Sequence, residues 1–257
     1  MNAGFHFLNA KILNCFDCPK KLDLDRDVLK PLIKVRQLSA YDSSEYIKDM
    51  GTPERYQEVA DDISSHKPQK RNLGNKQKAI FLDRDGTINQ YVGFLTDIRT
   101  FELLPGVCEA IKKINHSDYL CIVATNQPVI ARGQLSFHGL EEIHNKMETL
   151  LGNYGAYLDG IYFCPHHPDK GFDGEVKELK IECNCRKPKP GLLLKAAADF
   201  NIDLSQSFRL GDGKNDILCG KNAGCKTGLI SKEKTDLGQD YTGSSLADLV
   251  EQILGGK

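Results

Sequence analysis

From residue 79 onward, short apolar runs alternate with stretches whose apolar residues recur at helical spacing. The apolar runs predict five strands, at Ala79–Leu82, Tyr119–Ala124, Gly160–Phe163, Ser207–Leu210 and Lys226–Ile230. Helical patterns lie near residues 106–115, 137–152, 191–200 and 215–223, and the tail 244–254 adds another. Strands that alternate with helices are typical of βαβ units. We therefore expect an α/β domain over residues 77–257, with a parallel, Rossmann-like sheet and helices on both faces.

The first 63 residues carry a weaker pattern. The run FHFL at 5–8 predicts a strand, residues 25–34 predict a short helix, and residues 42–63 predict a turn that leads into a helix. So short a piece buries little core of its own, and we expect a small α+β segment that needs the larger domain or a partner to stay folded. Residues 64–76 are polar and basic without an apolar period, which indicates a linker or exposed loop.

Composition and charge narrow the functions that this chain can have. A formal net charge of −1 over 257 residues gives no electrostatic reason to expect nucleic acid or an anionic membrane as a partner. No apolar stretch approaches the length that a membrane-spanning helix needs, and the start of the chain lacks the pattern of a signal peptide. We expect a cytoplasmic monomer that acts on a small molecule.

Two aspartates, Asp83 and Asp85, directly follow the first predicted strand with one residue between them. In extended backbone, side chains two residues apart point the same way, so both carboxylates could meet one ligand. Gly86 allows the chain to turn sharply after them. Taken alone, the pattern fits equally well a strand-end turn in which an aspartate merely caps a helix.

Polar side chains also follow the other predicted strands. They are the neutral hydrogen-bonding residues 125–127, the cations within 186–189, and two further carboxylates, Asp212 and Asp216. Ligands of open α/β sheets bind beyond the carboxyl ends of the strands, where these residues would gather. Carboxylates suit Mg²⁺, which commonly shares a phosphate, and a hydroxyl with a cation would hold phosphoryl oxygens. The combination favours Mg²⁺-dependent phosphoryl chemistry.

Four potential metal ligands form the spacing C-x-H … C-x-C, namely Cys164, His166, Cys183 and Cys185. An odd total of nine cysteines and the lack of a secretion signal favour metal over disulfides. Three thiolates and one imidazole predict a closed, tetrahedral, structural Zn²⁺ site. The adjacent His167 could compete with His166 as the ligand. Unpaired buried cysteines beside a surface histidine are the alternative, which the tight spacings disfavour.

The order D-x-D-G-T, Thr-Asn, Lys and G-D-x-x-x-D resembles the haloacid dehalogenase (HAD) phosphohydrolases across the predicted α/β domain. The resemblance implies a HAD-like fold and a covalent aspartyl-phosphate mechanism. Carried over by position, Asp83 would be the nucleophile and Asp85 the general acid and base. Asp83, the backbone carbonyl of Asp85 and Asp212 would bind Mg²⁺. Thr125 and Lys187 would hold the phosphoryl group.

Within this superfamily, the stretches TNQPVIARG, LDGIYFCPHHP and CRKPKPG resemble the D-glycero-D-manno-heptose 1,7-bisphosphate phosphatases. The resemblance implies a zinc loop, no large cap domain, and removal of the 7-phosphate in nucleotide-activated heptose biosynthesis for lipopolysaccharide. It also implies a set of substrate-binding residues, Asn126, Gln127, Arg132, Arg186, Tyr91 and Phe94. Histidinol phosphate is the alternative substrate. Pro128-Val129 and Gly213 depart from the family, which usually has Ser-Gly and Lys there.

Residues 1–63 are similar to the C-terminal part of sugar-1-phosphate nucleotidyltransferases, in stretches such as NAGFHFLNAKIL and YIKDMGTPERY. The Gly-rich loop that cradles a nucleotide triphosphate is not in the sequence. We therefore interpret this segment as a fusion remnant, or as the end of a longer protein. A truncated nucleotidyltransferase/phosphatase fusion is the corresponding alternative for the function of the whole chain.

Overall fold

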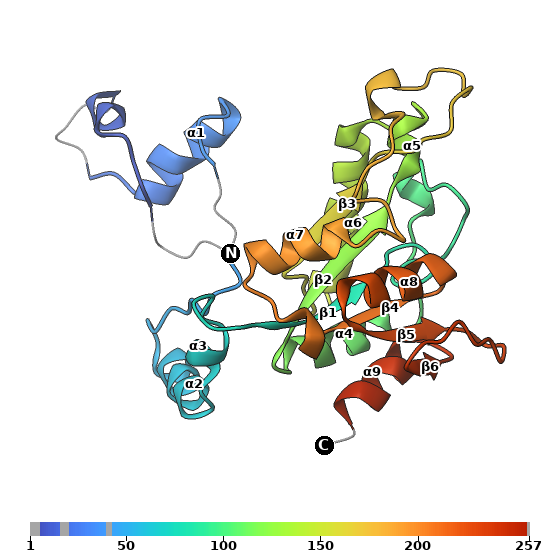
Figure 1. Cartoon of the computed structure of the whole chain (residues 1–257). Helices are drawn as coiled ribbons and strands as arrows, with labels where there is room; N and C mark the ends of the chain where they lie inside the picture. The colour runs from blue at the N-terminus through green and yellow to red at the C-terminus, as the bar shows by residue number, and fades with distance from the viewer. Residues whose placement is uncertain (1–5, 16–20, 40–42, 256–257) are drawn as a thin grey trace. The chain divides into compact units, whose positions relative to one another are not determined.

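The computed structural model describes residues 6–15, 21–39 and 43–255. The chain divides into two compact units, Met1–Pro68 and Gln69–Lys257. Figure 1 labels their helices and strands. Among the described residues, no helix combines the length and the apolar character that crossing a membrane requires.

The larger unit is built on one six-stranded parallel sheet. Its strands are β1 Lys78–Leu82, β2 Tyr119–Asn126, β3 Gly160–Cys164, β4 Phe208–Gly211, β5 Lys226–Ile230 and β6 Tyr241–Gly243. Their spatial order is β3-β2-β1-β4-β5-β6, so β1 lies in the middle, paired with β2 and β4. The predicted parallel sheet is confirmed. Strand β6 was not predicted, because three residues are too few to show the alternation of apolar and polar positions that indicates a strand.

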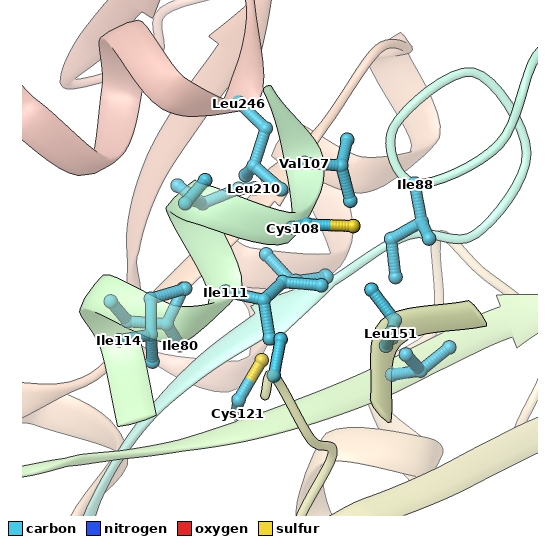
Figure 2. Close-up of a cluster of buried hydrophobic side chains, with 14 of the residues drawn as sticks. Ile80, Ile88, Val107, Cys108, Ile111, Ile114, Cys121, Leu151, Leu210 and Leu246 are labelled. Atoms are coloured by element: carbon cyan, nitrogen blue, oxygen red, sulfur yellow. The ribbon is translucent and has the colours of Figure 1, made fainter. Parts of the chain in front are cut away.

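Helices cover both faces of this sheet, as expected. They are α4 Val107–Asn115, α5 Pro128–Ala131, α6 Phe137–Gly152, α7 Gly191–Asp199, α8 Lys214–Ala223 and α9 Leu246–Leu254, with short 3₁₀ helices at Ile98–Thr100, Lys177–Leu179 and Leu204–Gln206. On one face, α4, α6 and α9 bury their apolar side chains against Ile80, Cys121 and Leu210 (Figure 2). On the other face, α7 and α8 pack against Phe81 and Ile122. The central strands are therefore shielded on both sides, which removes apolar surface from water and stabilises the fold.

The described part of the smaller unit is helical. It holds a 3₁₀ helix at Ala10–Cys15, a π-helix at Leu24–Leu29, α1 Lys30–Lys34, α2 Pro53–Ser64 and the start of α3 Lys67–Lys70. The two predicted helices are confirmed. The predicted strand over residues 5–8 is not: residue 5 lies outside the described residues, and residues 6–8 have no regular structure. An isolated strand has no neighbour to pair its backbone groups, so the expected α+β segment is helical where described.

The polar stretch 64–76 is not simply an exposed linker. Arg71 is buried, and its Nη1 donates to Oδ1 of Asp159 at 3.0 Å. The other oxygen of Asp159 accepts from the backbone N–H of Cys121 at 2.8 Å. The end of the stretch is thus fastened to the amino ends of β2 and β3. The sequence alone suggested a solvated run of charges, because the acid that pairs with Arg71 lies 88 residues away.

Candidate active site

The carboxyl ends of β1, β2 and β4 border a cavity of about 330 Å³. Its lining includes Asp83 after β1, Thr125 near the end of β2, and Asp212 after β4, together with Lys187. Asp83 is held in line with the sheet because its backbone N–H donates to the carbonyl of Leu210 at 3.0 Å. All four motifs that the sequence singled out therefore meet at one cavity.

A lysine and an arginine hold two buried carboxylates at the floor of the cavity. The Nζ of Lys187 lies 2.7 Å from Oδ2 of Asp83 and 2.7 Å from Oδ1 of Asp216. The Nη2 of Arg209 lies 2.5 Å from the same oxygen of Asp216 and also donates to the carbonyl of Ala124 at 2.8 Å. Asp216 is thus contacted closely by two cations, whereas Asp83 is close to Lys187, has Arg209 farther away at 3.8 Å, and lines the cavity.

Negative charge is concentrated around this floor. Carboxylate oxygens of Asp83, Asp212 and Asp216 lie within 4.8 Å of one another. Burial, and then the charge of Asp216, raise the pKa of Asp83 against the opposing effect of Lys187. Loss of hydration, together with Asp83 and Asp216, raises the pKa of Asp212 to about 6. A divalent cation such as Mg²⁺ would offset the repulsion between these crowded carboxylates and would favour their ionised forms. Carboxylate oxygens are also hard donors, so this donor set fits that ion.

Gly86 is required for this arrangement. Its φ is +79°, in the left-handed region, and a Cβ built there would lie 2.0 Å from Oδ2 of Asp212. Any other residue would be strained and would push Asp212 away from Asp83. The lack of a side chain at the glycine of the D-x-D-G-T motif thus leaves room for the carboxylate of Asp212, which follows β4.

The carboxylate of Asp85 lies apart from the three clustered acids. The Nη2 of Arg84 contacts both of its oxygens at 2.9 Å, and Nε2 of Gln127 donates to it at 3.0 Å. Asn89 donates to the same carboxylate at 3.1 Å. The Gln127 amide also donates to the hydroxyl of Thr125 at 3.0 Å. These hydrogen bonds hold the Asp85 side chain at the edge of the cavity, outside the cluster that Asp83, Asp212 and Asp216 form.

Asn126 braces the backbone of Lys187. Its Oδ1 accepts from the Lys187 N–H at 3.0 Å, and its Nδ2 donates to the Lys187 carbonyl at 3.2 Å. The cation is thereby tied to the end of β2. Asn126 and Gln127 line the cavity, as expected for substrate contacts, but their amides make these internal hydrogen bonds as well.

Three residues of the site were not identified from the sequence: Arg84, Arg209 and His144. Arg209 carries a signal that could have found it, because a lone arginine inside an apolar strand must be paired when buried. Arg84 occupies the variable position between the two aspartates and carries no such signal. The Nη1 of Arg84 lies 3.4 Å from Nε2 of His144, which reaches it from α6.

His144 should make the stability of the fold depend on pH. Burial, and then the charge of Arg84, lower its pKa from 6.5 to about 4, with Asp85 opposing. Because the folded pKa is below the unfolded one, the stabilisation is complete above pH 6.5 and is lost as the pH falls from 6.5 toward 4. Between pH 7 and pH 5, urea unfolding should show wild type losing about 2 kcal/mol more than His144→Gln. The same loss in both proteins would contradict this assignment.

The three cysteines and His166 come together at the end of β3. The three Sγ–Sγ distances are 3.5 Å for Cys164–Cys183, 3.2 Å for Cys164–Cys185 and 3.2 Å for Cys183–Cys185. Nδ1 of His166 lies 3.3 Å from Sγ of Cys185. His167 faces elsewhere, and its Nδ1 accepts from the backbone N–H of Asp169 at 3.2 Å. The cluster offers three sulfurs and one nitrogen, a donor set that fits a closed tetrahedral zinc site.

The remaining residues that the sequence assigned to substrate lie around the cavity mouth or outside it. Tyr91 and Phe94 line the cavity and are about half exposed or more, at 66% and 49%. Arg186 follows the last cysteine, and its Nη1 donates to the carbonyl of His166 at 3.3 Å. Arg132 does not line the cavity, and its guanidinium lies against the Phe94 ring.

A doubly covered parallel sheet with acids after β1 and β4 and a buried lysine between them defines a HAD-like phosphatase. A family model described as HAD-hydrolase-like matches residues 184–252. The D-glycero-beta-D-manno-heptose-1,7-bisphosphate 7-phosphatase of Pasteurella multocida is 40% identical over 186 residues, covering 70% of this chain and 98% of the relative. The protein of the same name from Escherichia coli K12 is 39% identical over 181 residues, covering 68% and 93%. The chain belongs to the D-glycero-beta-D-manno-heptose-1,7-bisphosphate 7-phosphatase family.

A solved structure agrees with this assignment. The D,D-heptose 1,7-bisphosphate phosphatase from B. bronchiseptica, complexed with magnesium and phosphate, is 32% identical and superposes with a TM-score of 0.61. The match covers 70% of this chain and all of that one. The fold, and the class of chemistry that it carries, are therefore shared with an enzyme whose structure holds a metal ion and a phosphate.

Proposed function

We propose that this protein removes the 7-phosphate from D-glycero-D-manno-heptose 1,7-bisphosphate, within the synthesis of nucleotide-activated heptose. The observation that carries the proposal is the match to phosphatases named for this substrate along 98% of the length of one of them. The site supports it, because Asp83 and Lys187 lie paired at the floor of a cavity whose mouth is lined by Tyr91 and Phe94. Aromatic side chains can pack on a sugar while the floor receives a phosphate.

In the first step, an Oδ of Asp83 attacks phosphorus and the bond from phosphorus to the sugar oxygen breaks. Asp85 gives its proton to that oxygen as it leaves. Lys187 and the hydroxyl of Thr125 hold the phosphoryl oxygens, whose charge redistributes in the transition state. The products of this step are an acyl phosphate on the carboxylate of Asp83 and a free sugar hydroxyl.

In the second step, water attacks the same phosphorus and Asp85 accepts its proton. The bond between phosphorus and Asp83 breaks, which restores the carboxylate and releases inorganic phosphate. Asp83, Asp212 and the backbone carbonyl of Asp85 would hold Mg²⁺, which when bound supplies positive charge beside the phosphoryl group. Asp216 keeps Lys187 in place through the buried contact between them.

We also propose that Cys164, His166, Cys183 and Cys185 hold a structural Zn²⁺. Cys185 directly precedes Arg186 and Lys187, so fixing the loop at its sulfur also fixes where these two cations leave it. Arg186 would then help to recognise the substrate, and Lys187 would reach Asp83. The zinc loop is in this way connected to the phosphate site through adjacent residues of one segment.

A phosphate-release screen tests the proposed substrate. Sugar mono- and bisphosphates and histidinol phosphate are compared by kcat/KM, and ³¹P NMR identifies which phosphate of the bisphosphate is lost. We expect heptose 1,7-bisphosphate to exceed the other compounds by about 10²-fold or more, with the 7-phosphate released. A preference for histidinol phosphate, or loss of the 1-phosphate, would refute the proposed substrate.

For residues 1–63 we propose a remnant of a sugar-1-phosphate nucleotidyltransferase that is joined by residues 64–76 to the phosphatase domain, residues 77–257. In the described part of the smaller unit, the buried apolar side chains are Val28, Leu29 and Val59 alone, while Phe7, Ile33 and Met50 are exposed. So little core supports a segment that depends on other contacts. We therefore expect this chain to form no nucleotide in a pyrophosphorolysis assay.

We further propose that the protein is a cytoplasmic monomer.

A further inference from the structure

Four side chains form a stack beside the active-site cavity: Phe94, Arg132, Phe172 and Lys180. The guanidinium carbon of Arg132 lies 4.2 Å from the centre of the Phe94 ring and 4.5 Å from that of Phe172. Nζ of Lys180 lies 4.5 Å from the centre of the Phe172 ring. Aromatic rings and cations thus alternate, and each cation meets the negative face of a ring.

The backbone beneath Arg132 is bound firmly to the loop that follows β3. The N–H of Ala131 donates to the carbonyl of Pro165 at 3.2 Å, and the N–H of Val176 donates to the carbonyl of Ala131 at 3.0 Å. Gly133 has a φ of +70°, and a Cβ there would lie 1.8 Å from the carbonyl oxygen of Gly174. Arg132 therefore projects from a turn whose position is set by loop 165–180.

The segment that carries Phe94 is much less enclosed. Tyr91, Val92 and Phe94 expose 66%, 46% and 49% of their surfaces. A Cβ at Gly93, whose φ is +80°, would have nothing within 4 Å. Phe94 nevertheless lines the cavity, so its position decides the shape of the mouth. The contact with Arg132 joins this exposed segment to the fixed turn.

The main contacts of the Arg132 side chain are with the rings of Phe94 and Phe172. Its Nε is buried without a hydrogen-bond partner, and its Nη2 lies 3.5 Å from Nε2 of His167. Arg132 is absent from the lining of the cavity, whereas Phe94 is part of it. This placement differs from a direct substrate contact, the role that the sequence suggested for Arg132.

We propose that Arg132 is a positioning residue that sets substrate specificity through Phe94. Stacked between Phe94 and Phe172, it holds the Phe94 ring at the cavity mouth, where the sugar part of a sugar bisphosphate would lie. The identity of that substrate rests on the proposed function, but the positioning of Phe94 does not. A small phosphate ester that occupies only the floor of the cavity should not depend on the stack.

Fluorescence tests the positioning independently of activity. The chain contains no tryptophan, so Phe94→Trp introduces a single tryptophan, which can be excited selectively over the tyrosines and retains an aromatic face for Arg132. Acrylamide quenching is compared for Phe94→Trp alone and in combination with Arg132→Met or Phe172→Leu. We expect either second change to raise the quenching constant about twofold, since the ring loses its support. Arg99→Met, which removes an exposed arginine paired with Asp97, is the matched control and should leave quenching unchanged.

Kinetic measurements on proteins that keep the native Phe94 then test the role of Arg132 in substrate specificity. For heptose 1,7-bisphosphate, Arg132→Met and Phe172→Leu should each raise KM about tenfold with kcat within about twofold of wild type. Arg132→Lys should recover most of the loss because it keeps a cation between the rings. Hydrolysis of p-nitrophenyl phosphate, which lacks the sugar, should be unchanged in all three, and thermal melting reports whether each variant is folded.

Three results would overturn the proposal. Unchanged quenching in both double variants would mean that the stack does not hold the ring. A raised KM in Arg132→Met alone, with Phe172→Leu like wild type, would assign Arg132 to direct substrate contact. An equal fall in kcat for both substrates in folded Arg132→Met would place its effect on the phosphoryl chemistry. If heptose 1,7-bisphosphate is not a substrate at all, only the proposed function fails, because the quenching result is independent of it.

Discussion

The Asp83→Asn variant should release phosphate at about 10⁻⁴ of the wild-type rate or less. The amide has nearly the same shape as the carboxylate, but it offers no nucleophilic oxygen for attack on phosphorus. Phosphate release with saturating heptose 1,7-bisphosphate is the measurement. Because the variant removes one of three crowded carboxylates, its melting temperature should equal or exceed that of wild type.

The matched control is Asp97→Asn, which changes a partly exposed aspartate that is paired with Arg99 and does not line the cavity. It should retain wild-type turnover. Turnover of Asp83→Asn within about tenfold of wild type would exclude Asp83 as the nucleophile, whatever the substrate proves to be. Wild-type folding of the variant, judged by melting and by zinc content, makes that result interpretable.

The Cys183→Ser variant should lose zinc together with most of its activity. We expect about one zinc per chain in wild type and well below half of that in the variant, measured by elemental analysis. We also expect kcat/KM to fall about 10²-fold, because the loop that places Arg186 and Lys187 loses its constraint. Trypsin should cut the 165–182 segment of the variant sooner than that of wild type.

Cys108→Ser is the control, since Cys108 is a buried cysteine that packs in the core away from the cluster. It should keep its zinc and its kcat, although its stability falls. Full zinc content in Cys183→Ser would contradict the assignment of this sulfur as a ligand. Loss of zinc with normal activity would mean that the loop positions Lys187 without metal.

Much of the fold could be predicted because its signals are local. The apolar run Ala79–Leu82 and the helical patterns around it are sufficient to indicate a parallel sheet, and parallel strands end at a common edge. That geometry is why Asp83 and Asp212, which lie 129 positions apart, could be placed in one site from the sequence. The cluster of Cys164, His166, Cys183 and Cys185 could be predicted for another reason, because a single residue separates the two potential ligands within each pair.

The rest could not be predicted because it depends on long-range packing in irregular segments. Arg132 looked like a substrate contact, and only the fold of loop 165–180 shows that Phe172 and Phe94 enclose its guanidinium. His144 is an ordinary position of a helical pattern until Arg84 is found beside it. Residues 5–8 had the composition of a strand, but composition supplies no neighbouring strand for 6–8 to pair with.

The ion pair between Arg71 and Asp159 and the active-site cavity lie at opposite edges of the sheet. Asp159 directly precedes β3, so the pair secures the chain at the amino edge of the sheet, whereas the cavity opens at the carboxyl edge. The chain therefore enters β1 from a point that is fixed at the edge of the sheet opposite the cavity. Changes within residues 69–77 can consequently alter the stability of the larger unit without altering the residues that line the cavity.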